Sequence, residues 1–513
     1  MDGPRSGVSG LAPCAQGYGP VAARAGASRL MGRLRHGPPA ALPRGGPLPP
    51  STPDTLSGMS FARLAGTLRS LPASARRTVL DVAAGRAPVT AVLLGTFTLR
   101  LATGVTGAML TFYFGRFQHH GGQPVQSWHV GVMVALFFAS ELIGSPIFGI
   151  LSDRIGHRRV MLVGPAFGAI AVIITGLTVS LPVIAFTRLL EGGSTAASVP
   201  SILGFIAFAT ASDELARGRA VARFEAATLA GILCGFVVAG PLFDLIGPPA
   251  FFLNALLYLL SFAIYRYGVR RDAEPAPAAS AHDPREGLHR YARILRSREV
   301  WFLAPTWIAI NATLGLFTTQ TLFQLVKQRD PMFADQQLMG GFDPTFISLG
   351  LGVGGLLFFA GLLYWGGRFK NLRRTTIIFR GIAGGFAVLV AGSIINHAGG
   401  SPVPFILAMV ALAAGGLFVL AGATPAAIGL LADVTEAFPD DRGAIMGLYS
   451  VFLGLGQITG ALVGGESAQR AGLDGIFIAS FVLLGIALVP LSHLRGYEHQ
   501  VGRVAVPRPP RAV

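Results

Sequence analysis

Four ionisable residues stand inside long apolar stretches of the sequence: Arg100, Glu141, Arg188 and Glu191. A charge in the interior of a membrane is costly, so such residues are functional candidates. Glu141 lies twelve residues before Asp153, which is about 18 Å along a helix and near the middle of a bilayer core about 30 Å thick. A carboxyl group that alternates between isolation and contact with a guanidinium binds and releases a proton. The chemistry indicated by these residues is therefore proton transfer within a membrane.

Two arginines are candidate partners for these carboxyl groups. Arg100 or Arg188 could contact Glu141, and Glu191 is a second candidate for the proton-coupling role. Arg188 and Glu191 are three residues apart, so they share one face of a helix and can pair locally. A static structural ion pair is the alternative interpretation.

The composition indicates that membrane helices position these charges. Of the 513 residues, 52% are hydrophobic and only 13% are charged, and the mean hydropathy is +0.58. This much apolar surface exceeds what a soluble core can hide, so the chain is predicted to cross a membrane several times. The two cysteines, Cys14 and Cys234, give no disulfide framework, and no spacing of Cys and His indicates a metal site.

Twelve apolar spans, each long enough to cross a bilayer as a helix, are predicted. They are Val89 to Phe114, Val130 to Leu151, Val160 to Val179, Leu181 to Phe208, Ala226 to Ile246, Phe251 to Val269, Val300 to Val326, Phe346 to Trp365, Thr375 to Ile395, Val403 to Ala432, Ala444 to Val463 and Gly475 to Leu491. The fold class is thus an all-α membrane protein of two six-helix bundles, over residues 88–269 and 300–495. Residues 270–299 are predicted to be a cytoplasmic linker.

The positive charges predict the orientation in the membrane. Most of the 41 Lys and Arg residues fall in the two tails and in alternate loops, which places both termini in the cytoplasm. The tail over residues 1–87 is rich in Pro, Gly, Ala and Arg and is predicted to be disordered. The alternative for residues 61–77 is an amphipathic helix on anionic lipid. Residues 496–513 form a second cytoplasmic tail. No nucleic-acid partner is predicted, because the net charge of +16 is explained by the loops.

The loop between the second and third spans, residues 149–159, reads GILSDRIGHRR. It resembles motif A of the major facilitator superfamily, G-x-L-a-D-r-x-G-r-k. The resemblance implies a conformational latch in which Asp153 packs against the N-terminus of helix 11, near residues 439–443, and Gly149 permits close helix approach. In the alternative interpretation, the loop only sets the topology. The residues assigned to the latch are Gly149, Asp153, Arg154, Gly156, His157 and Arg158, with His157 standing where the family more often has Arg.

Weaker resemblances support the same family. Residues 184–193 are similar to motif B, with Arg188 at the motif's arginine. The fifth span, Ala226 to Ile246, partly matches motif C of the drug-proton antiporters. The eleventh span, Ala444 to Val463, carries a similar glycine pattern. Ordinary helix packing is the simpler explanation for these small residues. The residues assigned to helix packing are Gly240, Pro241, Gly456 and Gly460.

The seventh span carries too many polar side chains to face lipid. In the family, helices 1, 4, 7 and 10 line a central cavity, so the resemblance implies that several of these side chains line a wet cavity. Asn311, Gln320 and Gln324 are the predicted substrate contacts in the second half of the chain.

The resemblance implies secondary active transport of a small organic solute by alternating access. Proton-coupled efflux is the leading hypothesis, and proton-coupled uptake of a metabolite is the alternative. A relative without transport activity, acting as a sensor or assembly factor, is a further alternative that the embedded charges disfavour. No Walker motif, hydrolytic triad or redox ligand set is present in the sequence, so neither an enzyme nor a cofactor is predicted, and a proton gradient would supply the energy. We expect a monomer in the inner (plasma) membrane.

Overall fold

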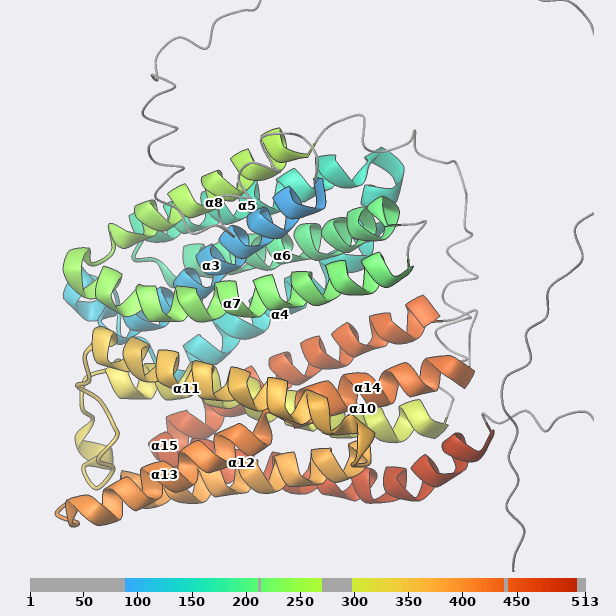
Figure 1. Cartoon of the computed structure of the whole chain (residues 1–513). Coiled ribbons are helices and arrows are strands. Elements are labelled where there is room, and N and C mark those ends of the chain that lie inside the picture. The colour runs from blue at the N-terminus through green and yellow to red at the C-terminus, as the bar shows by residue number, and fades with distance from the viewer. Residues whose placement is uncertain (1–87, 211–213, 270–297, 438–441, 505–513) are drawn as a thin grey trace, which may run out of the picture. The chain divides into compact units, whose positions relative to one another are not determined.

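The computed structural model describes residues 88–210, 214–269, 298–437 and 442–504 (Figure 1). Long α-helices account for most of these ranges. The helices before residue 270 are α3 (Pro88–Gly115), α4 (Ser127–Ile155), α5 (His157–Leu177), α6 (Leu181–Ala209), α7 (Glu214–Ile246) and α8 (Ala250–Gly268). The helices after residue 297 are α10 (Arg298–Val326), α11 (Pro344–Gly366), α12 (Arg374–Asn396), α13 (Val403–Leu420), α14 (Ala423–Ala437) and α15 (Arg442–Val504).

Eleven helical stretches of the described residues are long and apolar enough to cross a bilayer. The last of them, Ser450–Gly496, has 47 residues, which would extend about 70 Å as one straight helix. That length is about twice the thickness of a bilayer core. Within α15 the backbone leaves the helical region at Ala471 and Gly472, where Gly472 has a φ of 58°. The stretch therefore contains two spans, and the prediction of twelve membrane helices is confirmed.

Two helices differ from the sequence prediction. The tenth span was expected to be one helix over residues 403–432, but the structure divides it into α13 and α14 at Ala421 and Gly422. The break leaves the Phe418 carbonyl free to accept a hydrogen bond of 3.1 Å from the Trp365 indole. Helix α7 begins at Glu214 rather than at Ala226, so a charged segment that the hydropathy pattern assigned to a loop is helical.

Glycines permit the close approach of neighbouring helices. A Cβ on Gly192 of α6 would lie 2.2 Å from the Phe137 carbonyl of α4, and a Cβ on Gly235 of α7 would lie 2.4 Å from the Leu101 carbonyl of α3. Larger residues at these positions would force the helices apart. The helices before residue 270 and those after residue 297 form the two parts of the chain, and α11 of the second part runs alongside α7 of the first (Figure 1).

Candidate functional site

The predicted ion pair between Arg188 and Glu191, within α6, is present. Arg188 Nη1 lies 2.8 Å from Glu191 Oε2, and the two side chains are 8% and 2% exposed. The Arg188 guanidinium also lies over the Phe137 ring, 5.0 Å from its centroid. Within the described residues, Glu191 Oε1 and Arg188 Nε have no hydrogen-bond partner. The pair is therefore buried and tightly held, yet each member keeps one unsatisfied polar atom.

Glu141 lies in a different electrostatic setting. The described part of the chain gives it no ion pair, and the charge of Arg100, on α3, acts on it. The same arginine acts on Glu225 of α7. Arg100 is buried, and its Cβ lies where a Cβ on Gly231 would come within 2.9 Å. The positive charge of one buried guanidinium thus acts on two carboxyl groups on two other helices, and among the described residues neither carboxyl group forms an ion pair with it.

Glu225 was missed by the sequence analysis. Its neighbours include Arg217, Arg219 and Arg223, so the charged segment was read as a loop and the helix was expected to begin one residue later. The periodicity of a helix could have extended α7 backwards, but the low hydropathy of this segment hid it.

Gln320 and Gln324 of α10 bind the start of α4. Gln320 Nε2 donates to the Ser127 carbonyl at 3.1 Å, and Gln324 Nε2 donates to Ser127 Oγ at 2.8 Å. The Ser127 amide in turn donates to Gln469 Oε1 at 3.0 Å. These contacts lie at what we call the far end, formed by the helix ends near residues 115–131, 240–250, 324–348 and 465–475. Because α4 runs from Ser127 to Ile155, the far end is opposite the motif A loop.

A second set of contacts at the far end surrounds Asp244, in the last turn of α7. Its carboxylate accepts from Arg116 Nη1 at 3.0 Å, from the Thr345 amide at 2.8 Å and from Thr345 Oγ1 at 2.7 Å. The backbone amide of Gly240 donates to Ser348 Oγ at 2.9 Å. Together with the glutamine contacts, these bonds join the two parts of the chain, so the structure shows the far end closed.

The motif A residues lie in and beside a one-residue turn. Gly156, with a φ of 99°, ends α4 and precedes α5, a backbone conformation that favours glycine. Asp153 and Arg154 are exposed. The predicted partner of Asp153 is the segment 439–443, of which residues 439–441 lie outside the described residues. Arg158 is buried, and its Nε donates to the Val269 carbonyl at 2.6 Å while Nη2 donates to the Arg266 carbonyl. Arg158 therefore caps the C-terminal end of α8, a role that the motif did not indicate.

The structure also shows what surrounds two other residues of motif A, Gly149 and His157. A Cβ on Gly149 would meet only Pro200 Cβ at 3.7 Å, an ordinary contact, so close helix approach at Gly149 is not a feature of this state. His157 Nδ1 lies 3.2 Å from Ser152 Oγ, and its ring lies where a Cβ on Gly204 would come within 2.6 Å. His157 thus packs against α6.

The glycines assigned to helix packing lie at tight contacts. A Cβ on Gly240 would come 2.1 Å from the Pro344 carbonyl oxygen of α11, and Pro241 follows it within α7. A Cβ on Gly456 would come 2.6 Å from Asn311 Cβ, and one on Gly460 would come 2.1 Å from the Ala312 carbonyl oxygen. These last two positions hold α15 close to α10.

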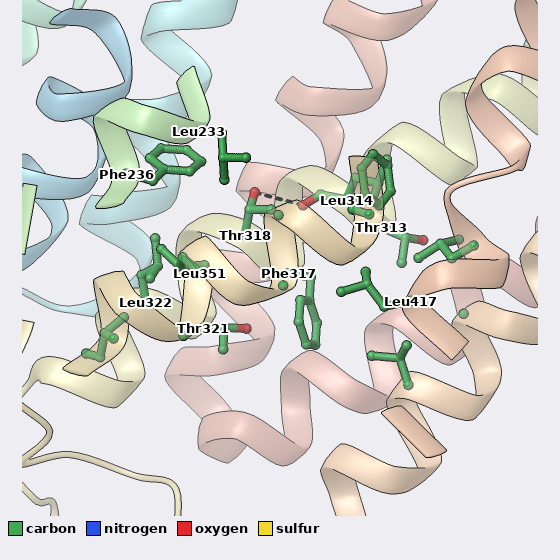
Figure 2. Close-up of a pocket in the computed structure, with 18 of the residues that line it drawn as sticks. Leu233, Phe236, Thr313, Leu314, Phe317, Thr318, Thr321, Leu322, Leu351 and Leu417 are labelled. Carbon is green, nitrogen blue, oxygen red and sulfur yellow. Dashed lines mark hydrogen bonds between the residues drawn. The ribbon is translucent and has the colours of Figure 1, made fainter. Parts of the chain in front are cut away.

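An apolar pocket of about 600 Å³ is lined by residues of α7, α10, α11, α12, α13 and α15 (Figure 2). Its hydroxyl groups come from one helix, α10: Thr313, Thr318 and Thr321. None of the three side chains expected to contact substrate is among its lining residues. Gln320 and Gln324 are fully buried against Ser127, and Asn311 donates to the Trp307 carbonyl of its own helix at 2.9 Å. Helical periodicity identified a polar helix but not which neighbour covers each of its faces.

A histidine and two aspartates meet at the far end of the second half, where no metal site was predicted. His397 Nε2 lies 2.9 Å from Asp474 Oδ2, and Nδ1 lies 3.6 Å from Asp335 Oδ2. The three residues are far apart in the sequence, so no local spacing reveals them. His397 Nε2 is within hydrogen-bond distance of Asp474, whereas the 3.6 Å separation of Nδ1 from Asp335 is longer than a hydrogen bond.

Comparison with known proteins places this geometry in a family. The sequence model of the Major Facilitator Superfamily matches residues 92–432. The tetracycline resistance protein, class D, of Salmonella ordonez is 27% identical over 371 residues, covering 70% of this chain and 86% of that protein. Multidrug resistance protein 2 of Bacillus subtilis is 27% identical over 222 residues, covering 43% of this chain and 52% of that protein. A crystal structure of the nucleoside transporter NupG superposes with a TM-score of 0.59 at 14% identity, covering 80% of this chain and 98% of that structure.

The helical membrane fold and the match of the family model to residues 92–432 establish the class of protein. The chain belongs to the Major Facilitator Superfamily and is an integral membrane transporter. The proteins of similar sequence are drug-resistance proteins, and the likeness to NupG shows the shared fold.

Proposed function

We propose that the protein exports a small organic solute from the cytoplasm in exchange for protons, by alternating access, and that it lies in the inner membrane with both termini in the cytoplasm. Export is supported by the sequence relatives, because a membrane transporter confers resistance most directly by removing a compound from the cell. The orientation is supported by the distribution of Lys and Arg.

The proposal of proton coupling is supported by the different charge partners of Glu141 and Glu191. Glu191 is held by Arg188 in a buried pair, whereas Glu141 faces Arg100 without an ion pair among the described residues. A cation at a fixed distance favours the ionised form of a carboxyl group equally in every state, so it does not drive the uptake and release of a proton. A carboxyl group whose distance to a cation changes with the conformation can take up a proton in one state and release it in the other. Glu141 is therefore the proposed proton carrier.

Arg100 supplies the switch in this proposal, because it is shared with Glu225. In one state the guanidinium would neutralise Glu141, and in the other it would turn towards Glu225 and leave Glu141 free to bind a proton. The close contact of α3 and α7 at Gly231, where a Cβ would come 2.9 Å from Arg100 Cβ, keeps the arginine next to the helix that carries Glu225. Movement of the side chain alone would then be enough to exchange partners.

The experiment is substrate-driven proton movement in proteoliposomes that contain a trapped pH dye, with a panel of dyes, sugars and organic acids. We expect Glu141→Gln to abolish uphill accumulation driven by a pH gradient while exchange of substrate across the membrane survives. Glu225→Gln is the companion variant, because it removes the second carboxyl group on which Arg100 acts. It should weaken the coupling, whereas it leaves the proposed proton carrier Glu141 in place.

Three results would contradict the proposal. Uphill transport by Glu141→Gln with an unchanged pH dependence would show that this residue is not the coupling site. Proton and solute moving in the same direction would indicate uptake by symport, and no flux with any member of the panel would favour a sensor or assembly factor.

A further inference from the structure

Among the described residues, one hydroxyl group of the apolar pocket has no hydrogen-bond partner. Thr318 Oγ1 donates to the Leu314 carbonyl at 2.9 Å, and Thr313 Oγ1 donates to the Ala309 carbonyl at 3.0 Å. Thr321 Oγ1 is buried and forms no hydrogen bond with any described residue. Figure 2 shows Thr321 on α10 next to Phe317, among the pocket-lining side chains. A buried polar group without a partner is costly, so this hydroxyl indicates a ligand.

The other side chains that line the pocket determine the polarity and the size of a ligand that fits it. It consists of leucine, isoleucine, valine, phenylalanine and glycine residues besides the three threonines. A charged ligand would lose its hydration there without gaining an ionic partner. A volume of about 600 Å³ lies within the range of pockets for small organic molecules. The pocket therefore fits an uncharged, mostly apolar molecule that offers one hydrogen-bond acceptor to Thr321.

We propose that this pocket is the solute site and that its substrates are uncharged, mostly apolar organic molecules with a carbonyl or ether oxygen that accepts a hydrogen bond from Thr321. This inference rests on the proposed function and narrows it, because such a site disfavours polar solutes. Residues from both parts of the chain line the pocket: Leu229, Ile232, Leu233 and Phe236 come from α7, and the others follow residue 297. A movement of one half against the other would therefore change the shape of the site, as a transport site requires.

A glycine on the pocket wall allows a substitution that fills the pocket, and a second glycine outside the pocket allows a control. Gly350 of α11 lines the pocket, and a Cβ there would meet no atom within 4 Å, so a larger side chain can be placed at the pocket wall without a backbone clash. Gly415 of α13 is also free of contacts, is exposed and does not line the pocket. Gly350→Phe and Gly415→Phe thus form a matched pair.

The test is equilibrium binding of prodan to the full chain in lipid nanodiscs, with empty nanodiscs as the background. Prodan is an uncharged naphthalene ketone, and its emission shifts to the red when the carbonyl accepts a hydrogen bond. We expect saturable binding to the wild type and to Gly415→Phe, and loss of binding in Gly350→Phe. Thr321→Val should raise the Kd about threefold to tenfold, the worth of one neutral hydrogen bond, and should shift the emission to the blue. Thr318→Val is the control, because its hydroxyl is already bonded to Leu314.

Several results would overturn the inference. Binding to Gly350→Phe as tight as to the wild type would place the probe elsewhere, and competition by uridine would show a polar site. An unchanged Kd and emission in Thr321→Val would show that Thr321 donates no hydrogen bond to the ligand. Because binding needs no gradient, failure here is distinct from failure of proton coupling in the proteoliposome assay.

Discussion

Asp244 on α7 holds Thr345 on α11 by two hydrogen bonds, one from the backbone amide at 2.8 Å and one from the hydroxyl at 2.7 Å. Thr345 is the second residue of α11, where backbone amides lack partners within the helix. The carboxylate therefore caps the helix and meets the positive end of its dipole. The latch predicted for Asp153 at the other end of the bundle uses the same physical interaction.

The first prediction concerns closure of the far end. Asp244→Asn removes the charge that binds both Arg116 and the N-terminus of α11, which should weaken the closed state by about 1 to 2 kcal/mol and shift its population roughly fivefold to thirtyfold. Double electron-electron resonance between spin labels at Gln123 and Met332, with Cys14 and Cys234 replaced, should show longer distances.

Asp343→Asn is the matched control for that experiment. Asp343 lies 3.5 Å from the same arginine, but its side chain is 80% exposed, and exposed pairs contribute little. We expect wild-type distances in this control. Equal effects of the two substitutions would show that the capping contact has no special role.

The second prediction tests the motif A latch. Asp153 is exposed in the state described here, so Asp153→Asn should leave the stability of this state unchanged. If Asp153 binds the N-terminus of α15 in the opposite state, the substitution removes a contact of that state alone and shifts the population towards the state with the far end closed. Distances between spin labels at the motif A end should lengthen. Unchanged distances with intact transport would leave the loop with only a topological role.

The sequence predicts those features of the structure that depend on one stretch of chain, and it does not predict those that depend on which helices become neighbours. Runs of about twenty apolar residues predict the spans, because a bilayer demands that length and gives no alternative to helix. The break at Gly422 could not be foreseen, since the apolar run continues through it. The pocket and the partners of Gln320 and Gln324 are equally hidden, because they depend on which helices become neighbours. The Arg188–Glu191 pair was predictable because its spacing within one helix brings the two side chains together.

The third prediction concerns orientation. Single cysteines at Arg285 and Gln337, in a background without Cys14 and Cys234, should react differently with an impermeant reagent added outside intact cells. Position 337 should be labelled and position 285 should not, because the positive charge bias places residues 270–299 in the cytoplasm. The reverse pattern would overturn the proposed orientation of both termini.

The fourth prediction is a pH dependence at the far end. His120 packs against Tyr113 and Phe243, and burial lowers the pKa of its imidazole, with the positive charges of His119 and Arg116 lowering it further. The folded state thus prefers neutral His120, while the unfolded chain takes up a proton near pH 6.5. This contribution to stability is complete above about pH 6.5 and is lost as the pH falls towards the folded-state pKa.

Thermal unfolding at pH 7.5 and pH 5.5 measures this contribution. His120→Gln should show a smaller decrease in the unfolding midpoint on acidification than the wild type, because glutamine does not titrate. Other groups titrate over the same range, so the difference between the two proteins is the relevant quantity. Identical decreases would show that His120 contributes nothing to the pH dependence.

The fifth prediction compares two glycines that the sequence analysis linked to close packing. A Cβ on Gly460 would lie 2.1 Å from the Ala312 carbonyl oxygen, whereas one on Gly149 would lie 3.7 Å from Pro200 Cβ. Gly460→Ala should therefore separate α15 from α10, destabilise the protein by about 1 to 3 kcal/mol and lower its unfolding midpoint. Gly149→Ala should leave the midpoint unchanged or raise it, since alanine favours a helix by about 1 kcal/mol over glycine.

Transport separates the two possible roles of Gly149. If motif A brings helices close at Gly149 only in the opposite state, Gly149→Ala will slow transport and favour the state with the far end closed, without any loss of stability. The measurements are the unfolding midpoint, solute flux in proteoliposomes and the spin-label distances at the far end, each made on both variants. Normal flux and unchanged distances in Gly149→Ala would show that this glycine supports no close approach in either state.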